Sequence, residues 1–211
     1  MIRGGHGNGA ASGTLWLIRH GESTWNVRGL AQGHHDGARL TARGEQQAAE
    51  LAAELRTQNI RTLYASDLRR ALETAAPLAE VLGLAVTLDA RLRERCLGVL
   101  EGTASAAISP EVTGLRSQRV ADPDARPDGG ESVRDLYERA ASFADELATR
   151  DHPGDVAVVA HGGTLRVLNA YLHGIAVERM AWEPLENGRI LRWPAQRHDR
   201  SLTPRERNDE I

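Results

Sequence analysis

The chain has 211 residues, of which 41% are hydrophobic and 26% are charged, and its formal net charge is −3. These values are typical of one soluble globular domain, and the mixing of acidic with basic residues argues against the basic patch of a nucleic-acid-binding protein. The single cysteine, Cys96, excludes an internal disulfide framework and a cysteine-based zinc site, and no apolar run approaches the roughly 20 residues of a membrane-spanning helix.

The predicted elements belong to one domain at 14–194, between a glycine-rich N-terminal extension at 1–13 and a polar C-terminal tail at 195–211, both of which we expect to be disordered or loose. Thr41 is a plausible N-cap for a first helix, and Ser132 with Asp135 resembles a capping box. Pro77 should kink or split the helix that contains it. The elements predicted in chain order are a strand at 15–18, a helix after Thr41 that includes 48–55, a strand at 62–65, a helix at 68–82, a strand at 85–88, a helix from 133 to about 147, a strand at 156–160, a helix from about 164 to 172 and a strand near 189–193.

Strands that alternate with helices predict an α/β fold, a three-layer sandwich whose mostly parallel central sheet is flanked by helices. In such sheets, ligands bind beyond the carboxyl ends of the strands. Two histidines follow predicted strands and precede a glycine: His20, in the sequence Arg-His-Gly-Glu at 19–22, and His161, after the strand at 156–160. We therefore expect the two imidazoles to meet over one edge of the sheet, and Arg19 beside His20 indicates that their ligand is an anion.

These residue types suit the transfer of a phosphoryl group. A neutral imidazole is a good nucleophile toward phosphorus, and an arginine can fork onto two phosphate oxygens, which a lysine cannot do. Arg69 and Arg70 stand where the strand at 62–65 leads into a helix, and Glu94 follows the strand at 85–88. A carboxyl group in a phosphate pocket can protonate a leaving alkoxide. Taken singly, however, the two arginines could be a solvated helix start, and Glu94 could form a surface ion pair with Arg93 or Arg95.

Together the motifs resemble the histidine phosphatase superfamily, the phosphoglycerate mutase-like proteins. The likeness runs from about Thr14 to Trp193 and implies a phosphoglycerate mutase-like fold. The motifs that carry it are Arg-His-Gly-Glu-Ser-Thr-Trp-Asn at 19–26, a segment at 33–48 that matches Gly-x-x-Asp-x-x-Leu-Thr-x-x-Gly-x-x-Gln-Ala with one extra residue, the segment at 66–75, Leu-Arg-Glu at 92–94, Gly-x-x-Glu-Gly at 98–102 and Gly-Gly-Glu-Ser at 129–132.

The resemblance also implies roles for individual residues. His20 would be the nucleophile that becomes phosphorylated, and Glu94 would be the general acid and then the base that activates water. Neither a metal nor a cofactor is implied. The residues that would hold the phosphoryl group are Arg19, Arg69 and His161, and those that would assist them or border the substrate are Asn26, Gln32, Gly33 and Gly162.

Departures from the glycolytic mutases favour a phosphatase. Cys96 and Leu97 stand where the mutases carry an aromatic residue that touches the substrate, and the region 103–106 lacks their lysine. His161 is followed by Gly162 and Gly163 rather than by Gly-Asn. A mutase must retain a bisphosphorylated intermediate and therefore needs extra cations, whereas a phosphatase lets water enter and the product leave.

We therefore expect a metal-independent phosphomonoesterase that acts through phosphohistidine on a small phosphorylated metabolite, such as a sugar, sugar acid or cyclitol phosphate. The segment 103–128 is expected to select the substrate; it could form a partial lid or a variable surface loop. A phosphoglycerate-type mutase and a non-catalytic member that binds a phosphorylated ligand are the alternatives. The expected location is the cytoplasm, with no nucleic-acid or membrane partner. Met180-Ala181-Trp182 could be an exposed patch, and a homodimer is possible.

Overall fold

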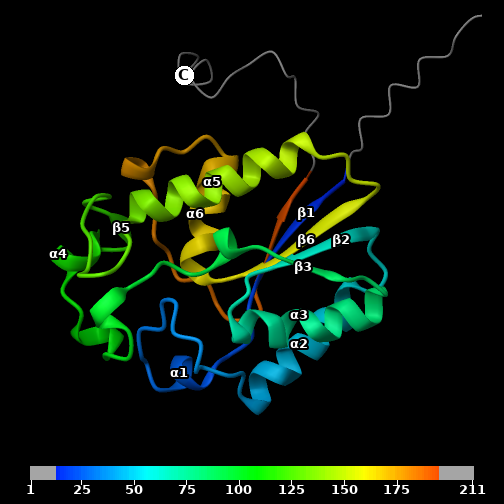
Figure 1. Cartoon of the computed structure of the whole chain (residues 1–211), viewed down its shortest axis with the longest axis horizontal. Coiled ribbons are helices and arrows are strands. Elements are labelled where there is room, and N and C mark those ends of the chain that lie inside the picture. The colour runs from blue at the N-terminus through cyan, green and yellow to red at the C-terminus, as the bar shows by residue number, and fades with distance from the viewer. Residues whose placement is uncertain (1–12, 195–211) are drawn as a thin grey trace, which may run out of the picture.

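A five-stranded sheet forms the middle layer of the structure, a computed structural model that describes residues 13–194 (Figure 1). Four of its strands are parallel, and β7 pairs antiparallel with β1 at one edge. The predicted mostly parallel sheet is therefore confirmed, whereas the predictions for 1–12 and 195–211 lie outside the described residues. In spatial order the strands are β3 (Val86–Leu88), β2 (Ile60–Ala65), β6 (Asp155–Ala160), β1 (Leu15–Arg19) and β7 (Ile190–Trp193).

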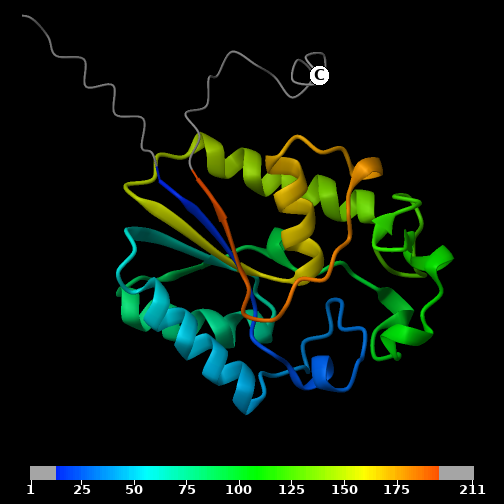
Figure 2. The same ribbon diagram turned by 180° about the vertical axis from the view of Figure 1, so that it is seen from behind.

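Helices cover both faces of this sheet (Figures 1 and 2). One face carries α2 (Ala42–Leu55) and α3 (Arg69–Leu82), and the other carries α5 (Val133–Thr149) and α6 (Gly162–Leu172). Within residues 13–194, no helix is both long and apolar enough to cross a membrane. The smaller elements are α1 (Thr24–Val27), α4 (Pro110–Thr113), a hairpin of β4 (Leu115–Arg116) and β5 (Arg119–Val120), and short 3₁₀ turns at Ala90–Leu92, Gly98–Leu100, Ser105–Ala107 and Val177–Arg179.

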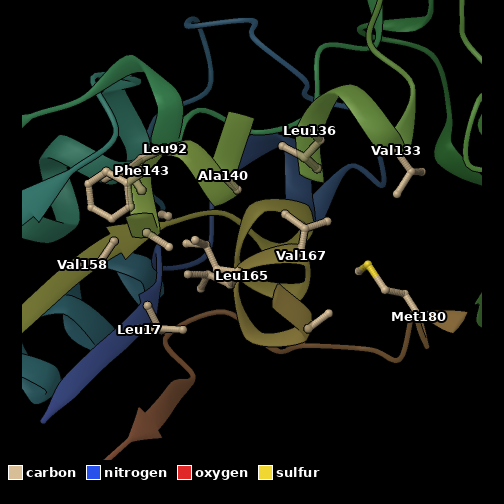
Figure 3. Packing of buried hydrophobic residues seen from close by; sticks show 14 of the residues in the cluster. Leu17, Leu92, Val133, Leu136, Ala140, Phe143, Val158, Leu165, Val167 and Met180 are labelled. Atoms are coloured by element: carbon tan, nitrogen blue, oxygen red, sulfur yellow. The ribbon is translucent and has the colours of Figure 1, made fainter. Parts of the chain in front are cut away.

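Alternating strand side chains build a core on each side of the sheet. Leu17 and Val158 pack with Phe143 and Leu165 between the sheet and the α5–α6 layer, as Figure 3 shows. Their strand neighbours, such as Val159, pack instead against α2 and α3. A parallel strand buried on both faces needs apolar side chains on both, which explains why β1 and β6 are continuous apolar runs.

The predicted helix ends are largely confirmed. The Thr41 hydroxyl accepts the backbone N–H of Gly44 at 3.0 Å, and Ser132 with Asp135 forms a capping box. The predicted split at Pro77 does not occur, since α3 is continuous from Arg69 to Leu82. A proline inside a helix costs about 3 kcal/mol, and burial of the face that holds Ala75 and Leu78 against the sheet and α2 offsets that cost.

The segment 103–128 is folded onto the body of the protein. The backbone of its hairpin pairs with the chain at 180–182, because Val120 N–H donates to Met180 O at 3.1 Å and Trp182 N–H donates to Gln118 O at 2.6 Å. Met180 packs into the core beside α5 and α6 and is only 1% exposed. The expectation of an exposed patch at 180–182 is therefore wrong for Met180, because its side chain joins the core, although Ala181 is exposed.

Candidate active site

The register of the sheet brings the two histidines together. β1 and β6 are neighbouring parallel strands in which Arg19 lies opposite Ala160, so the next residue of each strand is a histidine. The backbone N–H of His20 continues the pairing with a 3.0 Å bond to Ala160 O. The two imidazole centroids lie 5.1 Å apart with the rings tilted by 59°, and both side chains are buried. The expected meeting of His20 and His161 is confirmed.

Hydrogen bonds fix how His20 presents its ring. Its Nδ1 lies 2.7 Å from the carbonyl oxygen of Gly21. A carbonyl oxygen can only accept, so Nδ1 carries the proton and Nε2 keeps its lone pair. In His161, Nε2 lies 2.8 Å from Ser66 Oγ, while the buried Nδ1 has no partner in the structure.

Both imidazoles are held in the neutral form. Burial lowers the pKa of His20 well below its ordinary value of 6.5, and the positive charges of Arg70 and Arg19 lower it further. Burial and Arg70 likewise lower the pKa of His161. A neutral imidazole with a free Nε2 lone pair is the form of histidine that can act as a nucleophile.

Arg70 is the arginine of α3 that faces the histidines. Its side chain is 1% exposed, and it donates to the carbonyl oxygens of Gly33 at 2.9 Å and His35 at 3.1 Å. Burial lowers its pKa to about 10, and Glu94 opposes that shift. Arg70 therefore remains a cation at neutral pH, and its charge reaches both imidazoles.

The structure does not place Arg69 in the site, and that prediction is corrected in favour of Arg70. Arg69 is the first residue of α3 and forms a 3.0 Å ion pair with Glu73, with 44% of its side chain exposed. Consecutive helical residues point about 100° apart, so only one of two adjacent arginines can face the histidines. The other expectation for this pair, a solvated helix start, describes Arg69 correctly.

Arg19 is the last residue of β1 and directly precedes His20. It is half-buried and donates through Nη1 to the carbonyl oxygen of Leu185. Burial lowers its pKa, which Glu94 partly opposes. Arg19 is thus a second cation whose charge reaches His20.

Glu94 reaches the same edge of the sheet from the loop after the Ala90–Leu92 turn. Its Oε2 accepts the backbone N–H of Gly163 at 2.9 Å, and its Oε1 accepts the backbone N–H of Arg95 at 2.8 Å. The surface ion pair that we considered is not formed, because Arg93 pairs with Asp67 and the Arg95 guanidinium donates to backbone carbonyls. The carboxylate is oriented toward the N-terminus of α6 beside His161.

The remaining predicted residues organise the loop around the site. Asn26 Oδ1 accepts the backbone N–H of Ser23 at 3.0 Å and the side-chain amide of Asn187 at 3.2 Å. Gln32 Oε1 accepts from the Ser23 hydroxyl at 2.9 Å. The carbonyl oxygen of Gly33 binds Arg70, as described above. Gly162 begins α6, and a β-carbon there would meet the guanidinium groups of Arg166 and Arg19.

Sequence reasoning missed Arg166. This residue lies in α6 beside Gly162, its Nε donates to Glu183 O at 2.5 Å, and its guanidinium stacks over Trp182 at 5.3 Å. Burial lowers its pKa, and the charge of Glu94 opposes that shift. Its place one helical turn beyond Gly162 was a usable signal, because residues four apart lie on the same helix face.

The arginines of the 103–128 segment are occupied elsewhere. Arg116 pairs with Glu111 at 2.8 Å and is 66% exposed, and Arg126 pairs with Asp135 at 2.8 Å. Arg119 is exposed on the hairpin. In the described chain, none of the three contacts the two histidines.

Among the described residues, the buried side-chain atoms that lack a hydrogen-bond partner all belong to this site. Within residues 13–194, the buried side-chain nitrogens that lack a hydrogen bond are Arg19 Nε, Arg70 Nε and His161 Nδ1. Buried polar groups are nearly always paired, so such a group needs an explanation. Two cations and one imidazole with unused nitrogens form a site that suits a buried anion. The same part of the chain holds no group of three His, Cys, Asp or Glu side chains able to bind a metal ion.

Comparison with known families agrees with this geometry. The family model of the histidine phosphatase superfamily (branch 1) matches residues 15–204. The chain belongs to the histidine phosphatase superfamily.

Relatives and solved structures carry two kinds of name within this superfamily. The "Probable phosphoglycerate mutase GpmB" of Klebsiella pneumoniae is 39% identical over 165 residues, which cover 76% of this chain and 75% of that protein. A mycobacterial glucosyl-3-phosphoglycerate phosphatase, solved in a complex with VO3, is 33% identical with a TM-score of 0.76 and covers 86% of this chain and 92% of its own. A phosphoserine phosphatase mutant from Entamoeba histolytica, solved with phosphoserine, is 27% identical with a TM-score of 0.74, covering 85% and 89%.

Proposed function

We propose that this protein is a metal-independent phosphomonoesterase that acts on a small phosphorylated metabolite through a phosphohistidine intermediate. The observation that carries the proposal is the cluster of partnerless buried nitrogens, on Arg19, Arg70 and His161, around the available Nε2 of His20. A phosphoryl group presents several anionic oxygens at once, which matches these unused donors.

In the first half of the proposed reaction, His20 Nε2 attacks phosphorus and the ester P–O bond breaks. Glu94 delivers a proton to the departing alkoxide. In the second half, Glu94 takes a proton from water, the water oxygen attacks the phosphohistidine, and the P–N bond breaks to release inorganic phosphate. Arg19, Arg70 and His161 stabilise the charge on the transferring group throughout.

The names of two similar structures support the substrate class. The mycobacterial enzyme is called a glucosyl-3-phosphoglycerate phosphatase, and the Entamoeba enzyme a phosphoserine phosphatase. Both names describe phosphomonoesters of small polar metabolites. We propose a substrate of that kind, a sugar, sugar acid or cyclitol phosphate, for this chain.

A phosphoglycerate-type mutase is the second candidate, because the bacterial relative at 39% identity carries that name. Gly163 argues for the phosphatase. It occupies the position at which the mutases have asparagine, and its backbone packs directly against the Glu94 carboxylate, so a side chain there would collide with it.

The test uses the full-length protein in EDTA with p-nitrophenyl phosphate, beside the His20→Ala variant. His152→Ala is the matched control, because His152 lies before β6 at the opposite end of the sheet from His161. We expect hydrolysis in the wild type and the control, none in His20→Ala, and a phosphate label on His20 after an alkaline quench. Conversion of 3-phosphoglycerate to the 2-isomer without net hydrolysis would favour the mutase, and metal-dependent or His20-independent hydrolysis would reject the mechanism.

A further inference from the structure

The loop that carries Glu94 has no regular secondary structure at residues 93–97. A carboxylate that must deliver a proton to a particular oxygen needs a fixed position, and a misplacement of about 1 Å can cost roughly 100-fold in rate. The loop must therefore be held by contacts from outside itself.

Arg139 of α5 holds the backbone that leads to Glu94. Its Nη1 donates to the carbonyl oxygens of Arg91 at 2.7 Å and Arg93 at 3.0 Å, and its Nη2 donates to the carbonyl oxygen of Glu94 at 3.2 Å. The remaining donors bind both carboxylate oxygens of Glu131 at 2.8 Å each. All five N–H groups of the guanidinium are thus used, three of them on the backbone that leads to Glu94.

Glu131 holds the other end of the same loop. Its Oε2 accepts the backbone N–H of Cys96 at 2.9 Å, and its own backbone N–H donates to Cys96 O at 2.9 Å. Burial acts to raise the pKa of Glu131, but hydrogen bonds and charge from Arg139 outweigh it and keep the pKa below the ordinary value. The carboxylate is therefore ionised and paired at neutral pH.

His34 adds a further contact to the same carbonyl oxygen. Its Nε2 lies 2.8 Å from the Glu94 carbonyl oxygen, which also accepts from Arg139, and 4.0 Å from Glu131 Oε2. The carbonyl oxygen of Glu94 is thus held by both Arg139 and His34, while its carboxylate is held by the backbone N–H groups of Gly163 and Arg95.

We propose that Arg139 and Glu131 form a positioning pair for Glu94, which they hold in place for proton delivery without touching the substrate. This inference rests on the proposed function, in which Glu94 is the general acid. An acid matters most for poor leaving groups, because a good leaving group departs without a proton. Loss of the positioning pair, like loss of Glu94, should therefore slow the hydrolysis of esters with poor leaving groups more than that of esters with good ones.

The experiment compares phenyl phosphate, which has a poor leaving group, with p-nitrophenyl phosphate, which has a good one. We expect Arg139→Met and Glu131→Gln each to slow the hydrolysis of phenyl phosphate by about 10- to 100-fold. The hydrolysis of p-nitrophenyl phosphate should slow by less than about 3-fold. Arg139→Lys should not rescue the rate, since an ammonium group has three donors rather than five in a planar fork. Glu138→Gln, an exposed neighbour on α5, is the matched control and should leave both rates unchanged.

A second measurement separates positioning from general stability. In a Glu94→Gln background, Arg139→Met should lower the rate of phenyl phosphate hydrolysis by less than about 3-fold more, because both residues act through delivery of the same proton. Equal slowing of both substrates, or a full additional loss in the double variant, would reduce Arg139 to a structural residue. If the wild type shows no His20-dependent hydrolysis, the proposed function fails and this inference fails with it; if it does and the Arg139 variants match wild type, only the inference fails.

Discussion

The backbone N–H of Gly163 donates a 2.9 Å hydrogen bond to Oε2 of Glu94. This bond joins the first turn of α6, directly after His161, to the loop that carries the proposed acid. The approach is so close that a β-carbon added at position 163 would collide with Oε1 of Glu94. An added side chain at position 163 would therefore force the Glu94 carboxylate to move.

Replacing Gly163 by alanine should displace the Glu94 carboxylate while leaving His20 in place. We expect Gly163→Ala to lower kcat for phenyl phosphate by about 10- to 100-fold and to affect p-nitrophenyl phosphate far less. Steady-state kinetics on the two substrates measures the difference, with Glu94→Gln as the reference for loss of the acid. Equal rates on phenyl phosphate in the wild type and Gly163→Ala would mean that the contact does not position the acid.

The adjacent arginines of α3 should differ sharply when each is changed to methionine. Arg70→Met removes a buried cation beside both histidines and should reduce kcat/KM by about 100- to 1000-fold. Arg69→Met removes only an exposed ion pair with Glu73 and should change kcat/KM by less than about 3-fold. The two variants control for each other, and a larger loss in Arg69→Met would restore the original sequence-based assignment. Thermal unfolding should accompany the kinetics, because Arg70 also binds the carbonyls of Gly33 and His35.

The buried histidines should make the protein less stable in acid. Unfolded histidine titrates near 6.5, whereas burial and the neighbouring arginines lower the folded pKa of His20 and His161 well below that value. Above pH 6.5 both states are neutral and no cost arises. As pH falls from 6.5 toward the lowered folded pKa, the unfolded state binds protons that the folded state does not, so the free energy of unfolding falls.

Each histidine should contribute about 1.4 kcal/mol of this loss per pH unit inside that window. Urea unfolding of the wild type and of His161→Gln at pH 7.5 and pH 5.5, in buffers without phosphate, measures the contribution. The quantity to compare is the change in the free energy of unfolding between the two pH values, in the wild type and in the variant. His152→Gln is the control and should follow the wild type. An identical pH dependence in the wild type and His161→Gln would show that His161 does not stay neutral in the folded protein.

Arg95 should hold the 103–128 segment to the body of the protein. Its buried guanidinium donates to the carbonyl oxygens of Thr113 at 2.7 Å, Ala125 at 3.0 Å and Glu131 at 2.7 Å. We expect Arg95→Met to leave these acceptors unpaired and to increase proteolytic cleavage within 109–125 by about 10-fold or more. Arg116→Met, which removes an exposed ion pair with Glu111, should be cleaved by the protease at the wild-type rate. Unchanged protection in Arg95→Met would mean that the backbone pairing with 180–182 is sufficient.

The sequence predicted the sheet and its two histidines because those features are local. A short apolar run with three valines, such as 156–160, is typical of a strand buried on both faces, and a histidine directly after it stands at the carboxyl end. When two such strands are parallel neighbours, their ends coincide, so His20 and His161 could be placed together without coordinates. Glu94 followed from the same reasoning, since it also comes soon after a strand.

The errors arose where a shift of one residue along a helix, or a contact between distant segments, decides which side chain is buried. Arg69 and Arg70 differ by one position, and which of them faces inward depends on how α3 sits against the sheet. Met180 is buried in the core beside α5 and α6, and the backbone pairing of 180–182 with the hairpin leaves no periodic pattern in the sequence. Arg139 gave no signal for a similar reason, because three of its five donors bind backbone carbonyls, which every sequence contains.

The pairing of β1 with β6 also has a consequence for biosynthesis. A nascent chain carries His20 almost from its first emergence, but His161 and the strand that aligns it are made only after most of the fold. No shortened product that ends before β6 can assemble the imidazole pair, however well its early helices form. Fragments that end before β6 should thus be catalytically silent, and activity in a translation reaction would report chains that extend beyond His161 rather than total synthesis.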